Sequence, residues 1–170
     1  MFAVLIGSVA LSIATGSIMA LAKGSESLIN YTEMNTQSRV ALQLIGRQIR
    51  SAADVVSASS STLTVDCIEG DGSTTRNAYV YSSTNKTLTV TSTPAGGSSV
   101  SNVLLNDINY LAFDYFTLRH VTTTAPLEIK HVQLEAELLR NVLAQTNRNH
   151  IISARFMLRN KRVSNQAIST

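Results

Sequence analysis

Residues 1–22 read MFAVLIGSVALSIATGSIMALA, and this stretch contains no ionisable side chain. Lys23 is the first charged side chain of the chain. Twenty-two helical residues rise about 33 Å, enough to cross the roughly 30 Å hydrocarbon core of a bilayer. A cleaved secretory signal is the alternative interpretation, but it needs a basic segment ahead of its apolar run, and no basic residue precedes this one. The sequence therefore predicts a retained apolar helix.

The helical pattern continues beyond Lys23 with one apolar and one polar face. The apolar positions are Met34, Ala41, Leu42, Ile45 and Ile49. The opposite positions are polar or charged, at Glu26, Glu33, Gln37, Arg39, Gln43, Arg47 and Arg50. We expect one helix about 75 Å long, with residues 1–24 as its transmembrane or filament-core half and residues 25–53 as its amphipathic half. The amphipathic half is expected to dock on a β domain through four side chains: Met34, Leu42, Ile45 and Ile49.

Small residues recur along the apolar half at a heptad-like spacing. They form a small-residue stripe of Ala3, Gly7, Ala10, Ala14 and Ser17, beside a bulky stripe of Phe2, Ile6, Val9 and Ile13. No hydrophobic force acts between helices in lipid, so their association depends on the close backbone approach that small residues permit. We expect copies of the chain to pack through the small-residue stripe. The alternative is that these residues are simply common in membrane helices.

Residues 54–170 are rich in Ser, Thr, Val and Asn in short alternating runs, which predicts an antiparallel β domain. The expected strands are 62–68, 78–82, 86–91, 110–118, 129–139 and 151–159, with a loop at 93–102. In the last strand, apolar residues from Ile152 to Leu158 alternate with polar or exposed ones, typical of a sheet with one buried face. The predicted fold class is α+β, with the long helix packed on an antiparallel sheet.

The composition predicts no active site and no cofactor. The 170 residues carry a net charge of +3, too little for the dense basic surface of a nucleic-acid binder. Cys67 is the single cysteine, so we expect a small buried residue in a strand. The histidines, at 120, 131 and 150, lie in or beside strands without nucleophilic partners, and we expect them on the surface. Asp66, Glu69 and Asp71 are weak candidates for calcium ligands, since they lack the spacing of an EF-hand loop.

Two short segments and the apolar helix resemble the type IV pilins and the pseudopilins of type II secretion. Residues 39–52, RVALQLIGRQIRSA, are similar to the end of the helical stalk in the minor-pilin and pseudopilin branch. Residues 152–160, ISARFMLRN, are similar to its last strand. The resemblance implies a structural subunit of an extracellular filament that polymerises through its N-terminal helix. It implies as partners other copies of the chain, an inner-membrane assembly machinery and, before assembly, the lipid bilayer.

One position departs from this family. Its members carry a glutamate at the fifth mature residue, after a cleaved basic leader, whereas Leu5 stands here and Glu26 is the first acid. Either about six residues lie upstream of Met1, or this is a divergent subunit without the acid used in head-to-tail charge pairing.

Two other functions remain open on the sequence alone. One is a pseudopilin of a type II secretion system. The other is a monomeric membrane-anchored binding module, whose basic patch comprises Arg140, Arg148, Arg155, Arg159, Lys161 and Arg162. We expect these side chains to be solvated separately, and nucleic acid is not an expected partner. The expected location is a cell-surface filament, formed from a single-pass membrane protein.

Overall fold

The computed structural model describes the backbone of residues 2–142 and 145–161, and the side chains of residues 12–140 and 152–161. This part of the chain forms one long helix followed by eight strands, all paired antiparallel. The α+β class predicted from the sequence is therefore confirmed.

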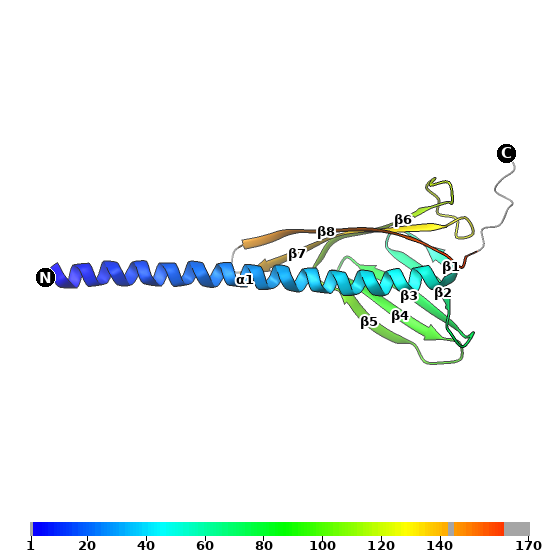
Figure 1. The fold of residues 1–170 in the computed structure, drawn as a ribbon, viewed down its shortest axis with the longest axis horizontal. Helices are drawn as coiled ribbons and strands as arrows, with labels where there is room; N and C mark the ends of the chain where they lie inside the picture. Colours follow the sequence, from blue (N-terminus) through cyan, green and yellow to red (C-terminus); the bar gives the residue numbers. More distant parts are fainter. Residues whose placement is uncertain (1, 143–144, 162–170) are drawn as a thin grey trace.

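Helix α1 runs without interruption from Phe2 to Ser51 (Figure 1). It ends earlier than the predicted boundary at residue 53, because Ala52 pairs with Cys67 as the first residue of a strand. Within the residues that the structure describes, no helical stretch is both long and apolar enough to cross a bilayer.

The first five strands form one sheet in chain order. They are β1 (Ala52–Ala58), β2 (Thr62–Ile68), β3 (Thr74–Ser82), β4 (Thr87–Pro94) and β5 (Val100–Leu105). The predicted bounds of β2 are confirmed, and β3 and β4 are longer than predicted. Strands β1 and β5 were not predicted, and the expected loop at 93–102 is shortened by the ends of β4 and β5.

The remaining strands form a second sheet of β6 (Ile108–Phe116), β7 (His131–Val142) and β8 (Gln145–Met157). The prediction of a single sheet is therefore wrong. The chain turns between the sheets at Asp107, which has a positive φ of 58°. The carbonyl of Asp107 accepts a hydrogen bond of 2.7 Å from the amide of Leu139. The turn thereby directs β6 to β7 instead of to β5.

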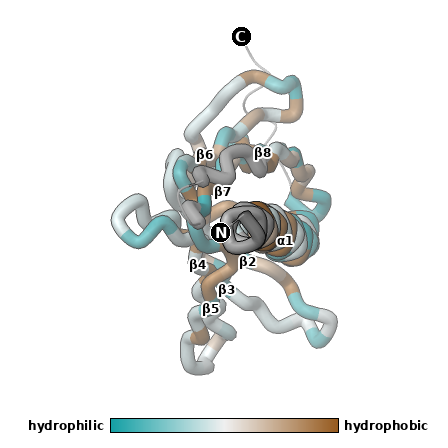
Figure 2. Tube along the Cα trace, turned by 90° about the vertical axis from the view of Figure 1, so that its left-hand side faces the viewer, coloured by the Kyte–Doolittle hydropathy of each residue, from teal (hydrophilic) through white to brown (hydrophobic). Residues whose placement is uncertain are grey.

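The second half of α1 lies between the two sheets. Figure 2 views the helix end-on, with β6, β7 and β8 on one side and β2 to β5 on the other. Gly46 allows α1 to approach β8 closely, because a Cβ at this position would lie only 2.7 Å from Phe156 Cε1. The first half of the helix projects away from both sheets (Figure 1).

The core combines apolar side chains from the helix and both sheets. Its fully buried members include Ile45, Ile49, Leu63, Val65, Tyr79, Leu88, Leu105, Ile108, Leu134 and Leu138. Cys67 is also buried, as predicted. In β8, Ile152 is buried while Ser153, Arg155 and Met157 are exposed, and Leu158, which directly follows the strand, is buried, so the predicted alternation is confirmed.

Candidate functional site

The projecting part of α1 exposes apolar side chains to solvent. Every side chain from Ser12 to Ser25 is exposed. Ile13 has 65% of its surface accessible and Leu21 has 79%, and Ile18 and Met19 are similarly exposed. Because the first charged side chain is Lys23, residues 12–22 form a continuous uncharged surface. Exposed apolar surfaces of this kind mark sites of interaction with another protein or with lipid.

The apolar surface continues along α1 past its junction with the β domain. Leu28, Ile29 and Val40 remain largely exposed, the first and last at 70% and 61%. The sequence pattern predicted a solvated face with polar or charged residues on this side of the amphipathic half, and it did not identify these exposed apolar residues. A shallow groove along it is lined by Leu28, Ile29, Thr32, Glu33 and Thr36. The exposed apolar face therefore extends beyond residue 24.

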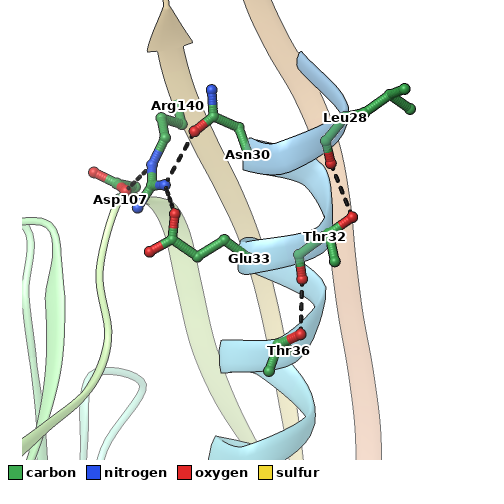
Figure 3. A network of polar contacts seen from close by, with 7 residues as sticks. All are labelled: Leu28, Asn30, Thr32, Glu33, Thr36, Asp107 and Arg140. Atoms are coloured by element: carbon green, nitrogen blue, oxygen red, sulfur yellow. Dashed lines mark hydrogen bonds and ion pairs between the residues drawn. The ribbon is translucent and has the colours of Figure 1, made fainter. Parts of the chain in front are cut away.

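Hydroxyl groups on this face are hydrogen-bonded within the helix itself. Ser17 Oγ donates to the carbonyl of Ile13 at 2.9 Å. Thr32 Oγ1 donates to the carbonyl of Leu28 at 2.9 Å, and Thr36 Oγ1 to that of Thr32 at 2.8 Å (Figure 3). Because these hydroxyls already have acceptors, burying them in a dry interface carries little desolvation penalty. The face can enter an apolar environment despite its Ser and Thr residues.

The small-residue stripe falls partly outside the described side chains. The structure does not describe the side chains of Ala3, Gly7 and Ala10. The side chains of Ala14 and Ser17 are described, and both are exposed. Ala14 precedes Thr32 by 18 residues, which is five turns of about 3.6 residues, so both lie on the same side of α1. The described part of the stripe thus continues into the groove at Leu28 and Thr32.

The predicted docking residues lie on the side of α1 that faces the sheets. Met34, Ile45 and Ile49 are buried, and Leu42 is half-buried against the core. Ala41 is also buried. Two polar residues on the same side, Asn30 and Ser38, are buried as well, and Ser38 Oγ donates to the carbonyl of Met34 at 2.7 Å.

Arg140 joins three elements where α1 leaves the β domain (Figure 3). Its Nε donates to Asp107 Oδ2 at 2.8 Å, and its Nη1 donates to Glu33 Oε2 at 2.7 Å. Nη1 also lies 3.3 Å from Asn30 Oδ1. Sequence analysis missed this cluster, because no local pattern relates an arginine on β7 to a glutamate on α1.

A second polar cluster fixes α1 on the five-stranded sheet. Tyr79 Oη donates to Gln48 Oε1, and Gln48 Nε2 donates to Asn77 Oδ1 at 3.4 Å. Ser92 Oγ donates to the same Asn77 oxygen at 2.6 Å. Burial raises the pKa of the Tyr79 hydroxyl, which therefore stays protonated as a donor. The buried polar atoms all have partners in the described structure.

Two of the three weak calcium candidates, Asp66 and Asp71, accept hydrogen bonds from other side chains. Asp66 forms a bidentate pair with Arg76, at 2.8 and 3.0 Å, and the hydrogen bonds from Arg76 hold the pKa of Asp66 below its usual value. Asp71 accepts hydrogen bonds from the amide and hydroxyl of Ser73. Across the described residues, no three His, Cys, Asp or Glu side chains converge as metal ligands would.

Three residues of the suggested basic patch, Arg140, Arg155 and Lys161, each have separate partners, and Arg159 is exposed. Arg140 binds two carboxylates, and Lys161 is buried with its Nζ 3.2 Å from Asp54 Oδ1. Arg155 donates to Gln133 and lies over the ring of Phe116. Arg148 and Arg162 lie outside the described side chains. The charges of Arg140 and Lys161 are therefore already paired with carboxylates.

His120 and His131 contact each other, which the sequence analysis did not anticipate. Their rings stack with centroids 4.6 Å apart. Burial lowers the pKa of His131, and the neighbouring His120, Arg155 and Lys130 lower it further.

Comparison of the chain with protein-family models gives no match, and comparison with curated proteins gives none either. The exposed face of α1 is therefore interpreted from its own geometry.

Proposed function

We propose that this chain is a structural subunit of a filament and polymerises through the exposed face of α1. The observation that carries the proposal is the uncharged helix surface of residues 12–22, whose side chains are all exposed. Full burial of an Ile, Leu or Met side chain contributes about 1.5–3 kcal/mol. Packing helices of several copies side by side buries this surface for every subunit.

The outward hydroxyls support helix packing over simple exposure to water. Ser17, Thr32 and Thr36 each donate to a carbonyl one turn earlier. Small side chains at Ala14 and Ser17 allow another backbone to approach closely. This mode of packing needs an exposed apolar helix and does not depend on a membrane span.

The form of filament that we propose is a type IV pilus-like fibre at the cell surface, with a type II secretion pseudopilus as the alternative. The resemblance of residues 39–52 and 152–160 to that branch supports both. A filament of this type would place the helices in the centre and the β domains outside. The third interpretation, a monomeric binding module, loses support because Arg140, Arg155 and Lys161 of its basic patch are each engaged by separate partners.

The test is assembly of the purified full-length chain after dilution out of detergent, observed by negative-stain electron microscopy. We expect regular filaments from the full-length chain and dispersed particles from residues 25–170 under the same conditions. Dispersed particles or shapeless aggregates from the full-length chain, or filaments from residues 25–170, would contradict the proposal.

A further inference from the structure

Two imidazole side chains meet at one end of the β domain. His120 lies in the loop between β6 and β7, and His131 is the first residue of β7. Figure 1 shows this loop at the end of the β domain that lies away from the projecting half of α1. The two rings stack with centroids 4.6 Å apart and planes inclined by 27°. His120 is exposed and His131 is half-buried, so solutes can reach the pair.

The backbone holds His120 in a conformation that few side chains adopt. The amide of Thr117 donates to the carbonyl of Val121 at 2.8 Å, and the amide of His120 donates to the carbonyl of Thr117 at 3.0 Å. These bonds close a tight turn in which His120 has a positive φ of 62°. Glycine would form the same turn without strain, so the turn itself does not need the imidazole. Strained backbone of this kind is concentrated at functional sites.

A thioether lies beside the two imidazoles. Met157 on β8 pairs directly with His131 on β7. Directly paired residues of antiparallel strands project to the same face of the sheet, with Cβ atoms about 4.5–5.5 Å apart. Met157 exposes 43% of its surface. Two nitrogen donors and one sulfur donor are therefore neighbours on one surface, and a thioether among the donors selects monovalent copper over harder cations.

The charges around His131 also favour a monovalent cation over a divalent one. Arg155 on β8 lies over the ring of Phe116, 4.1 Å from its centroid, and Phe116 pairs with His131 across β6 and β7. Burial lowers the pKa of His131, and the charges of His120, Arg155 and Lys130 lower it further. Positive neighbours repel a divalent ion twice as strongly as a monovalent one. The lowered pKa also keeps His131 neutral near pH 7, which is the form that binds a metal.

We propose that His120, His131 and Met157 bind one monovalent copper ion, Cu(I), at the surface of the β domain. Each imidazole supplies one ring nitrogen, and Met157 supplies its Sδ. Stacked rings do not direct their nitrogens at a common point, so binding requires the His120 ring to rotate. Its side chain is exposed and can rotate without disturbing the core. The site belongs to the β domain and goes beyond the proposed filament function.

The measurement is competition for Cu(I) between the full-length chain in zwitterionic detergent and the chromogenic chelator bicinchoninate, in anaerobic buffer with ascorbate. We expect the parent chain to bind about one equivalent of Cu(I). His120→Gly, His131→Gln and Met157→Leu each remove one donor and should weaken binding about tenfold or more. His120→Gly is the most informative variant, because glycine suits the positive φ and the turn is retained.

Two controls remove other donors of the same chemistry. His150→Gln removes the third histidine, which precedes Met157 by seven residues of β8, about 23 Å along an extended strand. Cys67→Ala removes a buried thiol whose pKa is raised by burial, so that it stays protonated and binds metal poorly. Both variants should bind Cu(I) within about twofold of the parent chain. Near-ultraviolet circular dichroism establishes that each variant is folded.

Three results would overturn the proposal. Unchanged affinity in His120→Gly and His131→Gln would mean that the imidazole pair is not the site. Weakening by both of these variants but not by Met157→Leu would make the site one of imidazoles alone and remove its selection for Cu(I). Weakening by His150→Gln or Cys67→Ala as large as that by His131→Gln would assign the copper to other donors. Filament formation, which electron microscopy reports, is a separate outcome.

Discussion

The guanidinium of Arg140 and the carboxylate of Glu33 form an ion pair of 2.7 Å between residues 107 positions apart in the chain. Asp107 lies on the other side of the same guanidinium, at 2.8 Å. The three residues come from β7, α1 and the turn that joins the two sheets. They lie where the helix begins to project, so they fix the direction of the exposed helix relative to the β domain (Figure 3).

Replacing Arg140 with Gln is expected to destabilise the β domain by about 1–2 kcal/mol, because it leaves the carboxylates of Asp107 and Glu33 without their shared cation. A double-mutant cycle measures the coupling free energy of the pair. It compares the free energy of unfolding in urea of the parent chain, Arg140→Gln, Glu33→Gln and the double variant. Since the Glu33 side chain is about half exposed, we expect a coupling of only about 0.5–1 kcal/mol. A coupling near zero would mean that the pair does not hold the helix.

Residues 25–170 are expected to fold as a soluble domain, because the side chains of residues 12–25 are exposed and the core uses the helix from Met34 onward. The check is a cooperative thermal transition by circular dichroism and a monomer mass by light scattering at low concentration. A non-cooperative transition would mean that the first half of α1 contributes to the fold.

Replacing Ile45 with Asp is expected to unfold that domain. Ile45 is fully buried, and an unpaired buried charge costs several kcal/mol against a typical domain stability of about 5–15 kcal/mol. Val40→Asp is the matched control, since Val40 lies on the exposed side of the same helix and its substitution should change stability by about 0.5 kcal/mol or less. Similar melting temperatures for the two variants would show that the buried side of α1 is wrongly assigned.

The contrast between β2 and β5 shows what the sequence predicts reliably. In β2, Leu63, Val65 and Cys67 are buried and alternate with half-buried polar residues, which is the pattern that predicts a strand. In β5, the first four residues are all exposed, so no alternation is visible. An edge strand defined by pairing with one neighbour leaves no periodic signal in its own sequence.

The candidate site also has a part that the sequence predicts and a part that it does not. The apolar surface of residues 12–22 and the buried positions Ile45 and Ile49 follow from composition and helical periodicity. The contacts of Arg140, and of Tyr79 with Gln48, join residues far apart in the chain. They depend on two sheets enclosing the helix, and the expectation of one sheet did not include that arrangement.

The pH dependence of stability is expected to include a contribution from His131. Its pKa is lowered in the folded state by burial and by His120, Arg155 and Lys130, so the unfolded chain binds a proton more readily. The stability from this group is complete above the ordinary histidine pKa of about 6.5 and is lost as the pH falls through the folded-state pKa. Between pH 7.5 and 5, the melting temperature should depend less steeply on pH in His131→Gln than in the parent chain. Identical slopes would exclude His131 as the source.

The last prediction concerns Ala14, the first described residue of the small-residue stripe. Ala14→Phe adds bulk where neighbouring helices are proposed to approach, and in a polymer the clash recurs at every subunit. Ala14 is exposed on the projecting helix, so the fold of the β domain should be unaffected. The control is Ile13→Leu, which conserves side-chain volume on the bulky stripe. It should weaken helix packing by no more than about 1.5 kcal/mol.

We expect Ala14→Phe to abolish filaments after dilution out of detergent, while Ile13→Leu assembles like the parent chain. The fraction of protein that pellets at high speed, together with electron microscopy of the pellet, measures this. Assembly of Ala14→Phe at the parental level would mean that helices do not meet through Ala14. The exposed apolar surface would then have another partner, and the helix-packing basis of the proposed filament would be lost.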